Sequence, residues 1–237
     1  MQQSAKFVPN VIGLQGIRGS GKDTAFEILQ ENRPFQRLAF ADLLYNEVSE
    51  AFGISVADLG NRLTKETPQA RLALSQCSNH HFREVFLRLH PTDNLNSPQS
   101  PRKILQYWGS EFRREQYSPT YWTDPILQTL LQNPSKNYAV TDTRFPNEAA
   151  LLTGVPLSML HKFSNTVPLP QGLPNAIIAR IRRPDIEEAY LALPKEEQHS
   201  SEISLLDWPV FVTWINEKNK QAEFKAQIRD FVQQYFP

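Results

Sequence analysis

The chain has 237 residues, in which 25 Lys and Arg balance 25 Asp and Glu, and 40% of the residues are hydrophobic. This length is enough to bury a sizeable core, as one large domain or as one domain with an embedded smaller lobe. The balanced charge disfavours a broad basic surface for nucleic acid or anionic lipid. No apolar run approaches the roughly 18 residues that a membrane helix needs. We therefore expect a cytoplasmic protein that binds small molecules, with no nucleic-acid or membrane partner.

Cysteine and histidine usage narrows the chemistry further. A single cysteine, Cys77, excludes an internal disulfide framework. Without a Cys-x-x-Cys pair or a His-rich segment, a structural zinc site is not expected.

The first predicted elements are a strand, a glycine-rich loop and a helix. Residues 11–15 form a short apolar run, and GIRGSGK at 16–22 follows it directly. Apolar residues then keep helical spacing until the Asn-Arg-Pro at 32–34. This order is the context that a phosphate-binding loop requires, and the segment fits G-x-x-x-x-G-K-[ST] up to its lysine.

Asp23 stands where Ser or Thr usually follows the lysine, with Thr24 next. Such a loop wraps a phosphate in backbone N–H groups, and its lysine adds a full charge. A carboxylate at Asp23 suits Mg²⁺, with Thr24 on a phosphate oxygen; alternatively, it is an acidic first-turn residue favoured by the helix dipole. The predicted cofactor-binding residues are Gly16, Gly19, Ser20, Gly21, Lys22, Asp23 and Thr24.

The middle of the chain is predicted to be mainly helical. A short strand at 38–40 ends at Ala41-Asp42, and a helix follows it to Gly53. Further signals are a capping pattern at 55–58, an apolar stripe at 82–89, a polar loop at 90–101, and a helix opened by Ser100-Pro101 that turns Leu105, Trp108 and Phe112 inward.

Strand and helix signals alternate again towards the end. In order they are a strand at 138–142, a helix from Pro146 to Gly154, a proline-rich excursion at 155–175, a strand at 176–181, a highly charged stretch at 182–202, a strand at 209–213 and an amphipathic helix over 224–235. The alternation predicts an α/β fold, a parallel sheet covered by helices.

Functional side chains recur where predicted strands end. Gly16, Asp42, Asp142 and Arg182 should meet at the carboxyl edge of the sheet. Asp142 has the position of a second metal-orienting acid, and Arg144 is suited to bidentate phosphate binding. Any one of the further arginine candidates is more often a solvated surface charge; they are Arg102, Arg114, Arg180, Arg182 and Arg183.

Six segments together resemble one family. They are GIRGSGKDT, FADLLY (40–45), RKILQYWGSEFRR (102–114), TDTRFPNEAA (141–150), RIRRP (180–184) and HSSE (199–202). In this order they look like the deoxynucleoside monophosphate kinases best known from tailed bacteriophages. The resemblance implies a three-layer P-loop fold like that of nucleoside monophosphate kinases. Residues 1–237 would form a single kinase domain, with a helical acceptor-binding insertion at about 43–135 and a mobile lid at about 182–204.

The same resemblance implies ATP-dependent, Mg²⁺-assisted phosphoryl transfer to deoxynucleoside 5′-monophosphates, which yields diphosphates for DNA synthesis, in host cytoplasm if the protein is viral. A homodimer is an expectation by analogy only. The implied catalytic residues are Lys22, Asp142, Arg144 and Arg183, and the metal residues are Asp23 and Asp142. The implied acceptor residues are Asp42, Arg102, Arg114, Arg144, Glu148 and Arg182, while Glu148, His199 and Glu202 would brace the site and lid.

Two departures from the family pattern, at Leu43 and Tyr45 and in the long excursion at 155–175, leave the base preference open, and two alternative functions stand beside this one. Leu43 and Tyr45 stand where family members often have Pro and Lys, so an acceptor-side cation is missing or supplied elsewhere. One alternative is a P-loop kinase for another small acceptor, a nucleoside or a phosphometabolite; a hydroxyl acceptor would call for a base such as Asp42. The other is a nucleotide-binding regulator without turnover.

Overall fold

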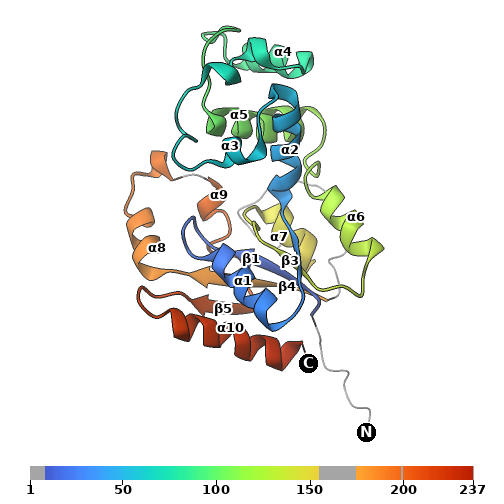
Figure 1. Cartoon of the computed structure of the whole chain (residues 1–237), viewed down its shortest axis with the longest axis vertical. Helices are drawn as coiled ribbons and strands as arrows, with labels where there is room; N and C mark the ends of the chain where they lie inside the picture. The colour runs from blue at the N-terminus through green and yellow to red at the C-terminus, as the bar shows by residue number, and fades with distance from the viewer. Residues whose placement is uncertain (1–8, 155–174, 199, 237) are drawn as a thin grey trace. The chain divides into compact units, whose positions relative to one another are not determined.

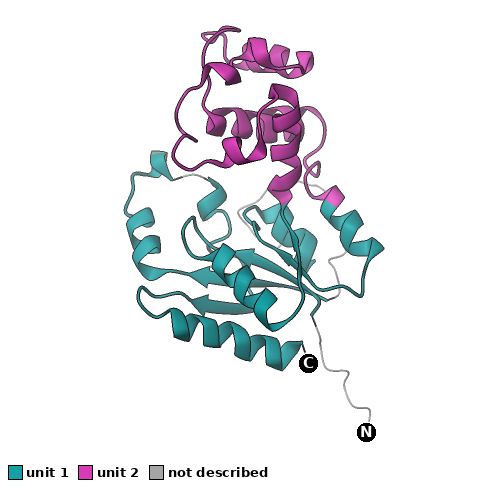
Figure 2. Cartoon of the chain, in the orientation of Figure 1, with its two compact units in different colours: residues 1–39, 126–237 teal, residues 40–125 magenta. Residues whose placement is uncertain are grey.

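The computed structural model describes residues 9–154, 175–198 and 200–236 (Figure 1). All but the last residue of the excursion predicted at 155–175 lies outside these ranges, as does His199. The chain forms two compact units, residues 1–39 with 126–237 and residues 40–125 (Figure 2).

The first unit is built on a parallel sheet. Its strands are β1 (Val11–Gln15), β2 (Gln36–Leu38), β3 (Tyr138–Val140), β4 (Ala176–Arg182) and β5 (Val212–Ile215), in the order β2-β3-β1-β4-β5. In the registers, Ile12 lies opposite Ala139 and Ile177, Arg37 opposite Ala139, and Arg180 opposite Thr213. The predicted parallel α/β class is confirmed.

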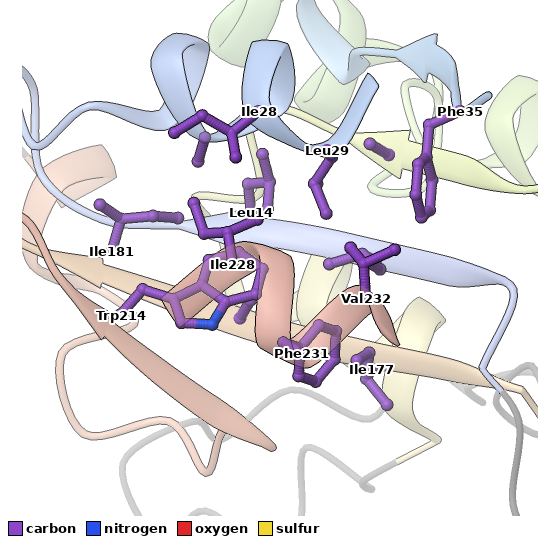
Figure 3. Close-up of a cluster of buried hydrophobic side chains, with 14 of the residues drawn as sticks. Leu14, Ile28, Leu29, Phe35, Ile177, Ile181, Trp214, Ile228, Phe231 and Val232 are labelled. Atoms are coloured by element: carbon purple, nitrogen blue, oxygen red, sulfur yellow. The ribbon is translucent and has the colours of Figure 1, made fainter. Parts of the chain in front are cut away.

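Helices cover both faces of this sheet. On one face, α1 (Lys22–Asn32) and α10 (Gln221–Tyr235) pack onto Leu14, Ile177 and Trp214 (Figure 3). On the other face, α7 (Pro146–Thr153) packs against Ile178. Successive strand residues point to opposite faces, so neighbouring residues of β4 serve different layers.

Shorter helices complete the first unit. They are α6 (Asp124–Gln132), which begins at the unit boundary, α8 (Pro184–Leu191), the 3₁₀ turn η5 (Lys195–Glu197) and α9 (Ser200–Ile203). The charged stretch predicted at 182–202 thus contains described helices that its composition alone did not define.

The second unit is helical and has its own core. Its elements are α2 (Phe40–Phe52), α3 (Val56–Gly60), the 3₁₀ turns η1 (Ala70–Leu72) and η2 (Leu74–Gln76), α4 (His80–Leu89), α5 (Pro101–Tyr107) and the π-helix η3 (Trp108–Arg114). Ser55, Asn79 and Ser100 cap α3, α4 and α5 through side-chain oxygens, so the helix starts predicted at Ser55 and Ser100 are confirmed. Phe82, Trp108 and Phe112 lie at the centre of the core.

A charged pair is set into this aromatic core. Glu47 accepts hydrogen bonds from Trp108 Nε1 (2.7 Å), Arg113 Nε (2.7 Å) and Tyr121 Oη (2.6 Å). The Arg113 guanidinium also lies 4.7–5.6 Å from the ring centroids of Trp108, Phe112, Tyr117 and Tyr121. Burial and the Glu47 carboxylate raise the pKa of Tyr121 to about 12. This pair is therefore held from several sides.

The main differences between the predicted elements and the structure concern two strands and one helix. The strand predicted at 38–40 is β2 at Gln36–Leu38, and the buried Phe40 begins α2 instead. The strand predicted at 209–213 is β5 at Val212–Ile215. The helix opened at Ser100 continues from Trp108 as a π-helix, a form that local propensity does not announce. Within the described ranges, no helix is long and apolar enough to cross a bilayer.

Candidate nucleotide-binding site

The glycine-rich loop joins β1 to α1 and has a backbone that only glycine adopts easily. Gly19 and Gly21 have φ angles of 84° and 104°. A Cβ atom at Gly21 would lie 2.3 Å from Asn216 Nδ2. The same amide donates to the Ser20 carbonyl over 2.8 Å. The loop therefore needs its glycines both for backbone conformation and for close packing.

Lys22, the first residue of α1, turns its ammonium group back into the loop. Lys22 Nζ donates to the carbonyls of Gly16 (2.6 Å) and Ile17 (3.0 Å), and the residue is 8% exposed. Burial, followed by the nearby charge of Arg144, lowers its pKa from 10.5 to about 8. An anion in the loop would favour the protonated form, because opposite charge offsets desolvation.

Four charged residues act on Lys22 and define the surroundings of the loop. Arg144 lowers the lysine pKa, whereas Glu202, Asp23 and Asp142 raise it. Asp23 lies in the first turn of α1, and Asp142 and Arg144 follow the end of β3. The structure thus brings together the predicted residues Lys22, Asp23, Asp142 and Arg144.

Glu148 fixes the backbone that carries Arg144. Its Oε2 accepts from the backbone N–H groups of Arg144 (2.8 Å) and Phe145 (3.0 Å) at the start of α7, and the residue is 2% exposed. This is the N-terminal end of a capping interaction, in which a carboxylate satisfies unpaired amide donors. The geometry gives Glu148 a positioning role; its contact with substrate stays a prediction.

The two arginines at the end of β4 lie at the start of α8. Arg182 donates from Nε and Nη2 to Glu187 at 2.7 and 2.6 Å, and Arg183 forms a longer pair with Asp185 at 3.3 Å. The hydrogen bond to Glu187 raises the pKa of Arg182. A Cβ at Gly19 would lie 3.6 Å from Ile186 of the same helix, so α8 runs beside the loop.

Arg180 has a structural role instead. Its guanidinium donates to Gln15 Oε1 (2.7 Å) and to the carbonyls of Leu205 (2.9 Å) and Trp208 (2.7 Å). These bonds tie the segment after α9 to the sheet, which accounts for Arg180 without a ligand.

Asn216 is a site residue that the sequence analysis missed. It follows β5, its backbone N–H donates to the Arg182 carbonyl (2.8 Å), and its side chain holds Ser20 as described above. Because the end of this strand was predicted two residues too early, the rule that site residues follow strand ends did not point to Asn216. The Ser20 hydroxyl is buried and has no hydrogen-bond partner among the described residues.

The other predicted acceptor residues belong to the helical unit. Asp42 is not at a strand end as expected, because α2 has already begun at Phe40; it is exposed in the first turn of that helix. Arg102 pairs with Glu66, and Arg114 ends the π-helix. These residues come from a different unit than the loop.

Lys65 is a further cation near this group. Its ammonium donates to the Tyr45 hydroxyl and lies 5.1 Å from the centre of that ring. Its carbonyl accepts from the Arg102 backbone N–H over 3.0 Å. Position 45 is a tyrosine and carries no charge. The fold therefore places a cation, Lys65 from the loop after α3, beside it.

The loop fits a polyphosphate and the nearby acids fit Mg²⁺. Backbone amides, the buried Lys22 ammonium and the Ser20 hydroxyl, which has no partner in the described part of the chain, are donors for phosphate oxygens. Mg²⁺ is usually held by one or two carboxylates plus substrate phosphates, and Asp23 and Asp142 are the carboxylates whose charges act on Lys22. No group of three or more His, Cys, Asp or Glu suited to a metal occurs within the described ranges. A parallel sheet with this loop after its first strand defines a P-loop α/β protein.

Comparison with curated proteins points to one kind of P-loop protein. The chain is 27% identical over 178 residues to a deoxynucleoside-5′-monophosphate kinase of Escherichia phage T5, covering 60% of this chain and 71% of the relative. It is 29% identical over 157 residues to a putative deoxynucleotide monophosphate kinase of Acanthamoeba polyphaga mimivirus, covering 59% and 66%. The predicted resemblance to this family is confirmed. No protein-family model matches the chain.

Two solved structures share a general likeness. The TT1252 protein of Thermus thermophilus aligns with 14% identity over 96% of this chain and 98% of its own, with a TM-score of 0.42. A dephospho-CoA kinase of Campylobacter jejuni aligns with 13% identity over 95% and 97%, with a TM-score of 0.45. At these TM-scores neither likeness bears on the site.

Proposed function

We propose that the chain is an ATP-dependent kinase that transfers a phosphoryl group to deoxynucleoside 5′-monophosphates and releases diphosphates. The observation that carries the proposal is the grouping of Lys22 with Asp142 and Arg144 around a glycine-rich loop. The names of the phage and mimivirus relatives support this acceptor over others.

The donor side of the proposed reaction lies in the first unit. Residues Gly16–Thr24 hold the ATP phosphates, and Lys22 and Arg144 neutralise charge on the transferring group. Asp23 and Asp142 would hold Mg²⁺, and the ion would supply further charge neutralisation at the phosphates. Arg183 binds the phosphates from the lid at 182–204, and Arg182 is the alternative candidate for this role.

The acceptor side is assigned to the helical unit, as the insertion that binds the monophosphate. Arg102, Arg114 and Asp42 are its predicted contacts, and Lys65 is added as the cation beside Tyr45. The attacking oxygen of a monophosphate is already ionised, so alignment and charge neutralisation suffice without a general base. This chemistry agrees with a site that is rich in arginine.

The test is an ADP-release assay with ATP and Mg²⁺ against deoxy- and ribonucleoside monophosphates and the corresponding nucleosides. We expect turnover with at least one deoxynucleoside monophosphate and none with nucleosides. Phosphorylation of nucleosides alone would establish the alternative with a hydroxyl acceptor. A flat response across the panel with folded protein that still binds ATP would favour the regulator.

A further inference from the structure

The phosphate loop already holds a carboxylate of the chain itself. Glu202, on α9, accepts from the Arg18 backbone N–H through Oε2 over 2.5 Å. Its other oxygen, Oε1, accepts from Arg144 Nη1 over 2.5 Å. The Glu202 side chain is 10% exposed, so these two donors meet it largely out of water.

These are the donors that a phosphoryl group would use. A loop amide and a guanidinium are both suited to phosphate oxygens, and a carboxylate offers the same two-oxygen edge with a negative charge. Glu202 is also the largest of the influences that raise the pKa of Lys22, ahead of Asp23 and Asp142. The Glu202 carboxylate therefore occupies donors, and supplies a negative charge near Lys22, where a bound phosphate would do the same.

The contact with the loop is not what anchors this segment to the unit. None of the four residues of α9 is buried. The anchor lies further on, where Leu205 and Trp208 are 1% and 3% exposed and Arg180 holds their carbonyls. Glu202 can therefore leave the loop while the chain beyond it stays attached.

We propose that Glu202 is a phosphate surrogate, which holds the Arg18 amide and Arg144 until the polyphosphate of the donor displaces it. Its departure frees Arg144 for the transferring phosphoryl group. The inference rests on the proposed function only in taking the loop as the donor site. Because the carboxylate must be displaced, the parent protein binds polyphosphate less tightly than its loop alone would.

The test is calorimetric titration of Glu202→Gln with Mg²⁺-free pyrophosphate and ATP, in the absence of any acceptor. The glutamine keeps the size of the side chain and removes the competing charge. We expect a dissociation constant about tenfold lower than that of the parent. Glu188→Gln removes the same charge from an exposed position on α8 and is expected to leave binding unchanged.

A second variant, Glu202→Ala, removes the acceptor altogether and is expected to shift affinity in the same direction. If Glu202 only braced the lid, both variants would bind pyrophosphate equally or more weakly, and the surrogate role would be rejected while the donor site stood. If pyrophosphate and ATP bound neither parent nor variant, the donor assignment would fall as well.

Discussion

The two units hold their cationic side chains in different ways. In the first unit, Lys22 is folded back onto loop carbonyls and Arg144 stands on a backbone pinned by Glu148. In the helical unit, Lys65, Arg102 and Arg113 are engaged with Tyr45, Glu66 and Glu47, side chain to side chain. The first arrangement is set by backbone and topology, and the second by packing. Under the proposed function, the first arrangement would serve the phosphates of the donor and the second the acceptor.

The largest effect is expected for Lys22→Met, which removes the charge of the phosphate loop. Loss of a preorganised charge at the transferring group is expected to lower kcat/KM by about 10²–10³. The matched control is Lys225→Met on α10, where the lysine is half-exposed and pairs with Glu31. Equal losses in both variants would show that charge in general, rather than the loop lysine, controls activity.

Lys22→Met is also expected to change how the free energy of unfolding depends on pH. The Lys22 pKa is about 8 in the folded protein and near 10.5 when unfolded. Between these values the unfolded chain binds more protons, so the parent gains stability as pH rises from 8 to 10.5 and carries the full penalty below 8. We expect Lys22→Met to remove this gain, about 3 kcal/mol at most. Urea unfolding from pH 7 to 10.5 checks it; parallel curves for parent and variant would contradict the lysine assignment.

In the helical unit, Glu47→Gln tests whether the contacts of Arg113 with Glu47 and the surrounding rings stabilise the fold. The change leaves Arg113 charged within an aromatic surround, and Glu47 is 16% exposed, so the free energy of unfolding should fall by about 2 kcal/mol. The control is Asp58→Asn, which removes an exposed ion pair with Arg71 and should have little effect. Similar results for the two variants would mean that the Glu47 network adds no stability.

Arg144→Lys keeps the charge near the loop and removes the planar fork. We expect kcat to fall about tenfold because bidentate phosphate contacts are lost. Arg229→Lys, on the exposed surface of α10, is the control. Full activity of Arg144→Lys would show that the charge of Arg144 matters and that its planar guanidinium does not.

The smallest effect is expected for Lys65→Ala. The substitution should raise KM for the monophosphate about fivefold, because it removes a charge-assisted hydrogen bond worth about 1 kcal/mol. KM for ATP should not change. A rise in both KM values would point to misfolding of the unit, and no rise in either would remove Lys65 from the acceptor side.

The loop was predictable because its motif is contiguous and its neighbours come from strand ends. Once the sheet was inferred, Asp142 followed from the rule that ligands gather at the carboxyl ends of parallel strands, and Arg144 lies two residues after it. Only the order and the approximate position of the strands were needed.

The missed features depend on structure that local sequence does not encode. A two-residue error in the end of β5 hid Asn216. The apolar run at 38–40 concealed the start of α2, which places Asp42 in the helical unit. Lys65 lies 20 residues beyond Tyr45, and Glu202 meets an amide 184 residues away. Such pairings are decided by tertiary packing, which no local motif announces.

The claim that the donor and acceptor anions bind separate units is tested most directly by titrating Lys22→Met with ATP and, separately, with a deoxynucleoside monophosphate that the parent accepts. We expect Lys22→Met to lose ATP binding while the monophosphate binds with the dissociation constant of the parent. Loss of both ligands together, or retention of ATP, would contradict it.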